Sequence, residues 1–125
     1  MKNLSKEDVL ELIEDFPIKP MFNKVLITLN TLDGDGIIVV DNNMLSDTQF
    51  VIAKGGMVNS VNEGDRVIID VKKLTRPVTF ESNNQVETVY EADIDAIEIG
   101  GVAFAFIEDR VIKAIDNRVE ETIKL

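Results

Sequence analysis

An all-β fold in one domain, a barrel or a sandwich, is predicted by the order of strand and turn signals along the chain. About eight short segments rich in apolar and β-branched residues alternate with turn signals. The strand–helix–strand alternation that is typical of a parallel sheet does not appear. The chain has 125 residues, which favours one domain, and 45% hydrophobic residues, which is enough for a core.

The N-terminal segment is predicted to be a helix that packs on this domain. Ser5 is a typical N-cap residue, and Glu7 and Asp8 place acids in the first turn. Apolar residues then recur at helical spacing and form one stripe, which consists of Val9, Leu10, Leu12, Ile13 and Phe16. Pro17 ends the helix, since the residue before a proline is pushed out of the α region. A contact between subunits is the alternative role of this helix.

After Pro20 the pattern of apolar residues changes to that of strands. The strands expected in the first part of the chain are residues 21–29, 37–40, 49–54 and 66–71. Residues 31–36 are expected to form a loop, because Gly34 and Gly36 tolerate positive φ angles.

Two hairpins are predicted in the second half of the chain. Segments 77–81 and 86–90 flank a four-residue loop, Ser82 to Gln85. Segments 94–99 and 102–107 flank the two-residue turn Gly100-Gly101. A last strand is expected at 111–115, and a charged tail follows it.

Charge and residue usage exclude several classes of function. The net charge of −10 argues against a nucleic-acid partner, because phosphate contacts need a basic face. The chain has no Cys and no His, so thiolate chemistry and histidine acid–base catalysis are excluded. No apolar run approaches the roughly 20 residues that span a membrane, and the N-terminus does not resemble a signal peptide. A cytoplasmic protein is the expectation.

Two acidic pairs could hold a cation or serve as an acid and a base, but each fits a simpler role. Asp33 and Asp35 lack the further oxygen ligands of a calcium loop, so a turn is favoured. Asp93 and Asp95 lie two residues apart on a predicted strand and are expected to be solvated. No catalytic residue, metal site or cofactor is therefore predicted.

The apolar run Ile37-Ile38-Val39-Val40 has two interpretations. It is either a half-buried edge strand or an exposed hook for the groove of a partner, since exposed apolar groups often serve binding.

A series of motifs over residues 17–115 resembles the GroES-type co-chaperonin family. Residues 18–25 are similar to the start of the family's first strand, with Asn23 where Asp is usual. Residues 35–39 are similar to the end of its mobile loop, with Asp35 in place of the first Gly. Val51–Gly55 is similar to the end of one of the family's strands, and Val61–Val67 is similar to one of its turns. Glu108–Ile115 matches the family's closing strand in part.

The resemblance implies a GroES-like, partly open β-barrel over residues 17–115. Residues 1–16 would be a helical extension, residues 116–125 a charged tail, and the stretch 72–95 would contain an added hairpin. The family forms homo-oligomeric rings, typically heptamers, which cap an ATP-dependent chaperonin and enclose an unfolded client protein. No enzymatic activity, nucleic acid or membrane is implied.

The resemblance also implies where the chaperonin binds. The residues that match the end of the family's mobile loop are Gly36, Ile37, Ile38 and Val39. In the family, the three apolar residues at these positions dock between helices of the chaperonin apical domain. The short loop, the missing roof hairpin near residues 56–61 and the long 72–95 stretch are similar to virus-encoded members, such as those of phages. A structural or adaptor β-barrel module of a viral particle or other assembly is the alternative function.

Overall fold

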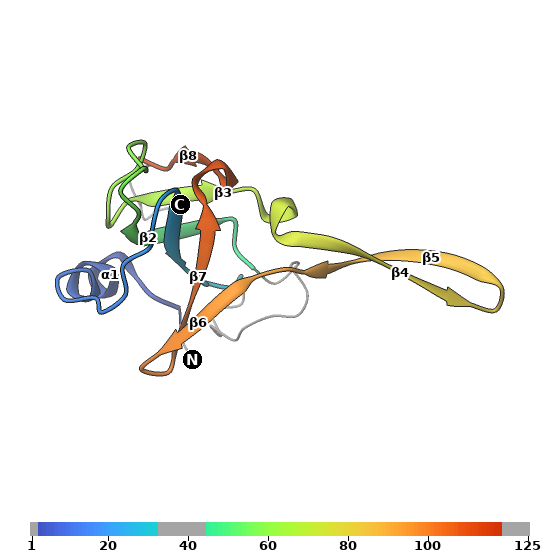
Figure 1. Ribbon diagram of the computed structural model, residues 1–125. Coiled ribbons are helices and arrows are strands. Elements are labelled where there is room, and N and C mark those ends of the chain that lie inside the picture. Colours follow the sequence, from blue (N-terminus) through green and yellow to red (C-terminus); the bar gives the residue numbers. More distant parts are fainter. Residues whose placement is uncertain (1–2, 33–44, 119–125) are drawn as a thin grey trace, which may run out of the picture.

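The described part of the chain folds into antiparallel β-sheets and one short α-helix (Figure 1). The computed structural model describes residues 3–32 and 45–118. Its elements in chain order are α1 (Lys6–Leu12), β1 (Lys24–Thr28), β2 (Thr48–Lys54), β3 (Arg66–Ile69), β4 (Thr75–Ser82), β5 (Gln85–Ala92), β6 (Asp95–Ile99), β7 (Val102–Glu108) and β8 (Ile112–Ile115). The predicted all-β class is therefore confirmed. Within the described residues, no helix is long and apolar enough to cross a membrane.

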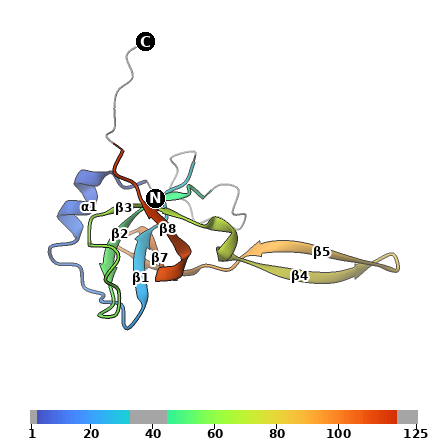
Figure 2. The ribbon, with the colours of Figure 1, turned by 90° about the horizontal axis from the view of Figure 1, so that it is seen from above.

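Six strands form the main sheet in the order β6-β7-β1-β2-β3-β8, and every neighbouring pair is antiparallel. The register shifts between Leu26 and Ile27, where β1 pairs with β2, and between Ile68 and Ile69, where β3 pairs with β8. Such irregularities bend and twist strands. β6 and β8 are the two end strands of this order, and Figure 2 shows β8 and β3 crossing above β1 and β7.

The central strands are buried on both faces because a core lies on each side of them. One core cluster is built from side chains that include Val25, Ile27, Val51, Val67, Ala105 and Ile107. The other lies under α1 and is built from Leu4, Val9, Leu26, Phe50, Ile52, Ala53 and Phe104. The helix therefore packs on the sheet as predicted, with Val9 fully buried.

α1 is shorter than the predicted helix of residues 5–16. It ends at Leu12, with Ile13 as its C-cap. Ser5 forms a capping box with Asp8 at the other end, as the sequence predicts. Phe16 lies beyond the helix but still packs on the sheet, since its ring meets that of Phe104 edge to face at 5.1 Å between centroids.

Strand ends differ from the prediction at several places, and three of these differences have a local cause. β1 begins at Lys24, because Phe22 takes a positive φ of 58° that no regular strand contains. β3 ends at Ile69, because the Asp70 side chain accepts from the N–H of Lys72 and caps a 3-10 turn. β8 begins at Ile112, one residue later than predicted, because Asp109–Val111 form a second 3-10 turn. The strand predicted at 37–40 lies outside the described residues.

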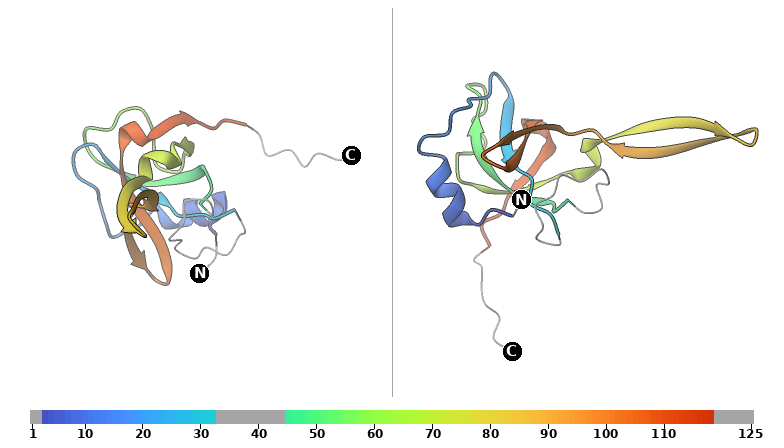
Figure 3. Two further views of the ribbon diagram at one scale, coloured as in Figure 1. Left: turned by 90° about the vertical axis from the view of Figure 1, so that its right-hand side faces the viewer. Right: turned by 90° about the horizontal axis from the view of Figure 1, so that it is seen from below.

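The hairpin of β4 and β5 has a two-residue turn rather than the predicted four-residue loop. Ser82 pairs directly with Gln85, and Asn83 and Asn84 take φ angles of 54° and 62°. Asn tolerates this left-handed region, and consecutive positive φ angles are typical of a type I′ hairpin turn. The resulting ribbon projects from the main sheet (Figures 1 and 3).

The hairpin of β6 and β7 has the predicted turn. Gly100 and Gly101 connect its strands with φ angles of 59° and 80°, and Ile99 pairs with Val102. Gly64 in the predicted Val61–Val67 turn also has a positive φ, of 88°, which explains the glycine at that position.

Candidate functional site

The residues predicted to bind a partner, Gly36, Ile37, Ile38 and Val39, lie outside the described residues. The chain on either side of segment 33–44 is described, and its two ends meet. Thr31 and Leu45 form an isolated antiparallel bridge, and the N–H of Ser46 donates to the carbonyl of Asn30 at 3.0 Å. The described residues that flank this segment therefore lie side by side.

The side-chain amide of Gln49 on β2 is fully buried and joins the two chain segments that flank residues 33–44. Its Oε1 accepts from the hydroxyl of Thr28 at 2.7 Å and from the N–H of Asn30 at 2.8 Å. Its Nε2 donates to the carbonyls of Asn30 and Ser46, both at 2.8 Å. The hydroxyl of Thr28 accepts from the N–H of Phe50 in turn. A satisfied buried network of this kind specifies one arrangement of the chain.

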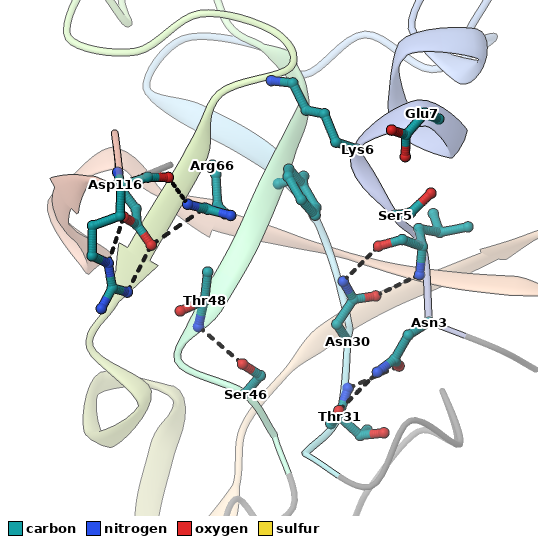
Figure 4. A pocket seen from close by; sticks show the side chains of 13 residues that line it. Asn3, Ser5, Lys6, Glu7, Asn30, Thr31, Ser46, Thr48, Arg66 and Asp116 are labelled. Atoms are coloured by element: carbon teal, nitrogen blue, oxygen red, sulfur yellow. Dashed lines mark hydrogen bonds and ion pairs between the residues drawn. The ribbon is translucent and has the colours of Figure 1, made fainter. Parts of the chain in front are cut away.

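Two asparagines attach the N-terminal segment to the same place (Figure 4). The Asn3 side chain donates to the carbonyl of Thr31 at 2.8 Å and accepts from its N–H at 3.0 Å. The Asn30 side chain makes the same double contact with the backbone of Leu4, at 3.0 and 2.9 Å. We call the network of Asn3, Asn30, Ser46 and Gln49 the anchor frame. It joins α1, β1 and β2 at the base of segment 33–44.

A charged cluster joins the start of β3 to the residues just after β8, and Figure 4 shows Arg66 and Asp116 near Asn30 and Ser46. The Asp116 carboxylate is buried and receives hydrogen bonds from the Arg118 guanidinium at 2.8 Å, with Nε of Arg66 at 3.3 Å. The hydrogen bonds from Arg118 lower the pKa of Asp116 far below its usual range, against the opposing effect of burial. The same contact raises the pKa of Arg118. The cluster holds the end of β8 against β3.

A shallow groove runs between the start of α1 and this cluster. Its lining includes Lys6, Thr48 and Phe50 beside Arg66 and Asp116. Lys6 donates to the carbonyl of Gly64, and the carboxylate of Asp116 is shared by two guanidinium groups. Because these charged groups already have partners within the subunit, the groove fits a structural role better than ligand binding.

Of the two acidic pairs, only Asp93 and Asp95 are described, and they form no site. Asp93 and Asp95 are both exposed, and only Asp95 belongs to a strand, at the start of β6. Asp33 and Asp35 lie outside the described residues. Among residues 3–32 and 45–118, no group of three or more His, Cys, Asp or Glu side chains could hold a metal ion.

The anchor frame is not among the features that the sequence predicts. One signal was present, since Gln49 is a lone amide beside the apolar run of residues 50–53. Asn3 and Asn30 carry no local signal, because their partners Thr31 and Leu4 lie 28 and 26 residues away in the sequence.

No protein-family model and no curated protein matches this chain. Its family is therefore a matter of proposal.

Proposed function

We propose that the chain is a subunit of a GroES-type co-chaperonin ring, which caps an ATP-dependent chaperonin and encloses an unfolded client protein. The observation that carries the proposal is the anchor frame beneath segment 33–44. This segment contains Gly36-Ile37-Ile38-Val39, the run that resembles the chaperonin-binding end of the family's mobile loop. The buried Gln49 amide joins its two ends to the sheet.

A fixed base suits a segment that has to bind a partner from every subunit of a ring. Ordering a segment on binding costs free energy, so one apolar tripeptide binds weakly. Several copies on one ring act together, because the first contact raises the effective concentration of the rest. This gain requires that each segment start from a defined position, which the anchor frame supplies.

The strand order is compatible with a partly open GroES-like barrel. In the family, terminal strands pair between neighbouring subunits, and here β8 is an end strand of the main sheet. An end strand carries unpaired backbone groups that can accept a neighbouring strand. We propose a ring of seven subunits, by resemblance, that acts in the cytoplasm of a host cell on behalf of a virus. The chaperonin would supply ATP hydrolysis, and the chain itself would not be an enzyme.

The substitution Ile38→Asp tests the proposed contact. If Ile38 enters an apolar groove, the carboxylate loses its water without gaining a partner, which costs on the order of a few kcal/mol per subunit. We expect the variant to keep its ring mass and melting temperature and to lose retention on an immobilised GroEL-type chaperonin in the presence of nucleotide.

Leu32→Asp is the matched control, since it adds the same charge at an exposed apolar residue beside the frame. It should retain chaperonin binding. A folded Ile38→Asp ring that still binds places the contact elsewhere and contradicts the proposal. An unfolded Ile38→Asp subunit identifies Ile38 as a core residue instead.

A second candidate function is a structural or adaptor module of a viral particle. The observation that favours it is the projecting β4–β5 ribbon, which displays apolar side chains away from the main sheet. The native mass of the protein, measured with and without a chaperonin and nucleotide, separates the two functions. An increase in native mass that requires both chaperonin and nucleotide supports the co-chaperonin function. A large assembly whose mass does not change when chaperonin is added supports the structural module.

A further inference from the structure

The β4–β5 ribbon is exposed along most of its length. Its strands pair with each other from Thr75–Ala92 to Ser82–Gln85, and the N–H of Asp93 donates to Leu74 at its base. In Figures 1 and 2 its outer part extends far from the main sheet. A two-stranded ribbon by itself is only marginally stable in water. A surface from outside the subunit would therefore stabilise it.

The ribbon carries apolar side chains on both faces. Residues that pair directly share a face, so Val78 and Val89 lie together with Phe80, and Tyr90 lies beside Pro77 on the other face. Val86 and Tyr90 are 64% and 72% exposed. Exposed apolar groups gathered on one element indicate a contact with another molecule.

A second exposed apolar group lies on two turns of the main body. Met21, Phe22 and Met57 are 63%, 64% and 65% exposed, and we call them the two-turn patch. The turns are joined, since the N–H of Met57 donates to the carbonyl of Phe22 at 3.0 Å and that of Gly55 to Lys24 at 2.8 Å. A side chain at Gly55 would collide with the Phe22 carbonyl, at 2.2 Å from the position of its Cβ. The patch is therefore a defined surface.

The backbone at Phe22 supports a binding role for this patch. Its φ of 58° is unfavourable for a bulky residue, and the side chain gains little burial within the subunit in return. Strained residues of this kind cluster at functional positions.

The charges around the ribbon and the patch are complementary. Segments 17–24 and 54–60, which contain the patch, carry three lysines and no acidic residue in a chain of net charge −10. The ribbon carries three glutamates and one arginine. The guanidinium of Arg76 lies 3.9 Å from the carboxylate of Glu91, measured from nitrogen to oxygen. Glu81 and Glu87 remain on its outer half. Complementary potentials favour the association of two surfaces and select their partner.

The ribbon and the patch lie on different sides of one subunit. Figures 2 and 3 show the turns before β1 and after β2 at the side of the sheet away from the ribbon tip. A ribbon therefore reaches a patch on another copy. Contacts between two different surfaces of identical subunits continue from copy to copy and close into a ring when the rotation permits.

We propose that the β4–β5 ribbon of one subunit binds the two-turn patch of the next. On one face of the ribbon Val86 and Tyr90 cover Met21, Phe22 and Met57, and Glu81 on the same face approaches the lysines of segments 17–24 and 54–60. This contact rests on the ring part of the proposed function and adds a contact to the pairing of terminal strands.

Disulfide trapping tests the contact cleanly, because the chain contains no cysteine. The variant with both Met57→Cys and Tyr90→Cys should form, on mild oxidation, a ladder of covalent oligomers longer than dimers. The control variant with Leu10→Cys and Tyr90→Cys places the first thiol at an exposed residue of α1 instead and should form no ladder. Absence of the ladder from the first variant, or an equal ladder from the control, overturns the proposal.

Charge exchange gives a second measurement. Glu81→Lys should raise the protein concentration needed for assembly by about tenfold, and adding Lys19→Glu should restore it. Glu87→Lys, on the opposite face of the ribbon, is the control and should leave this concentration unchanged. If the charge-reversed ribbon variant keeps its native mass and this concentration, the ribbon is not the contact. The proposed ring is not contradicted by that result. If the ladder forms but a GroEL-type chaperonin does not retain the protein, the contact stands and the co-chaperonin function fails.

Discussion

Gln49 holds both backbone groups of Asn30, accepting from its N–H and donating to its carbonyl, each at 2.8 Å. Gln49 lies on β2 and Asn30 lies two residues beyond the end of β1, so one side-chain amide continues the contact between the two strands past the last ladder pair. This relationship fixes the end of β1 where the chain enters segment 33–44.

Replacing Gln49 by Leu should destabilise the fold strongly. Leu has a similar size but leaves the backbone of Asn30, the carbonyl of Ser46 and the hydroxyl of Thr28 without this partner in a buried place. We expect a loss of about 3 kcal/mol in the free energy of unfolding, measured by urea titration. Gln85→Leu, at an exposed residue of β5, is the control and should change it by less than about 0.5 kcal/mol. Equal effects of the two substitutions would show that the network contributes little.

The stability of the fold should depend on the ionisation of Asp116. Its pKa is lowered from 3.8 in the folded chain, chiefly by hydrogen bonds from Arg118. The stabilisation is therefore fully present above pH 3.8 and is lost as the pH falls toward the depressed folded pKa. Urea midpoints of the protein and of Asp116→Asn should differ at neutral pH and converge in acid. A constant difference between the two midpoints across this pH range contradicts the linkage.

The ribbon turn should be sensitive to the loss of asparagine at positive φ. Asn84 has a φ of 62°, which alanine adopts at a cost of about 1 kcal/mol. In Asn84→Ala we expect amide protection across β4 and β5 to fall by about fivefold in hydrogen exchange. Asn59→Ala changes an exposed asparagine between β2 and β3 and should leave the ribbon's protection unchanged. Unchanged protection in Asn84→Ala would mean that the turn does not limit the ribbon's opening.

The elements that the sequence predicted well are those with local causes. The turn at Gly100-Gly101 and the strands beside it follow from residues that are neighbours in the chain. The Asn83-Asn84 turn lies where the sequence predicts a loop, but it has two residues instead of the predicted four. The pairing of Ser82 with Gln85 could not be predicted, because polar residues at a ribbon tip leave no alternation of apolar residues to count.

The anchor frame could not be predicted because its causes are distant in the sequence. β1 and β2 are buried on both faces, so their apolar runs contain no alternation that would mark Gln49 as facing a partner. Its partners depend on the register of β1 against β2, which includes a shift between Leu26 and Ile27. The early end of α1 has a similar origin, since Phe16 packs on Phe104 from outside the helix.

Phe22 should show a conflict between the stability of one subunit and assembly. Its φ of 58° costs a bulky residue about 1 kcal/mol or more, whereas asparagine adopts this conformation more easily. If the phenyl ring is displayed for the ribbon of a neighbour, Phe22→Asn should unfold about 1 kcal/mol less readily when measured below the assembly concentration. The same variant should need about tenfold more protein to assemble, because the contact loses its aromatic group.

Met21→Asn is the matched control for this last variant. Met21 is the adjacent residue of the patch and is equally exposed, but it is not among the described residues with a positive φ. Its replacement should weaken assembly without stabilising the subunit, because it removes apolar surface and relieves no strain. Urea titration of the dissociated protein and native mass across a dilution series measure the two effects. If Phe22→Asn destabilises the subunit and assembles as before, the ring of Phe22 serves the fold of its own subunit, and the two-turn patch has no role between copies.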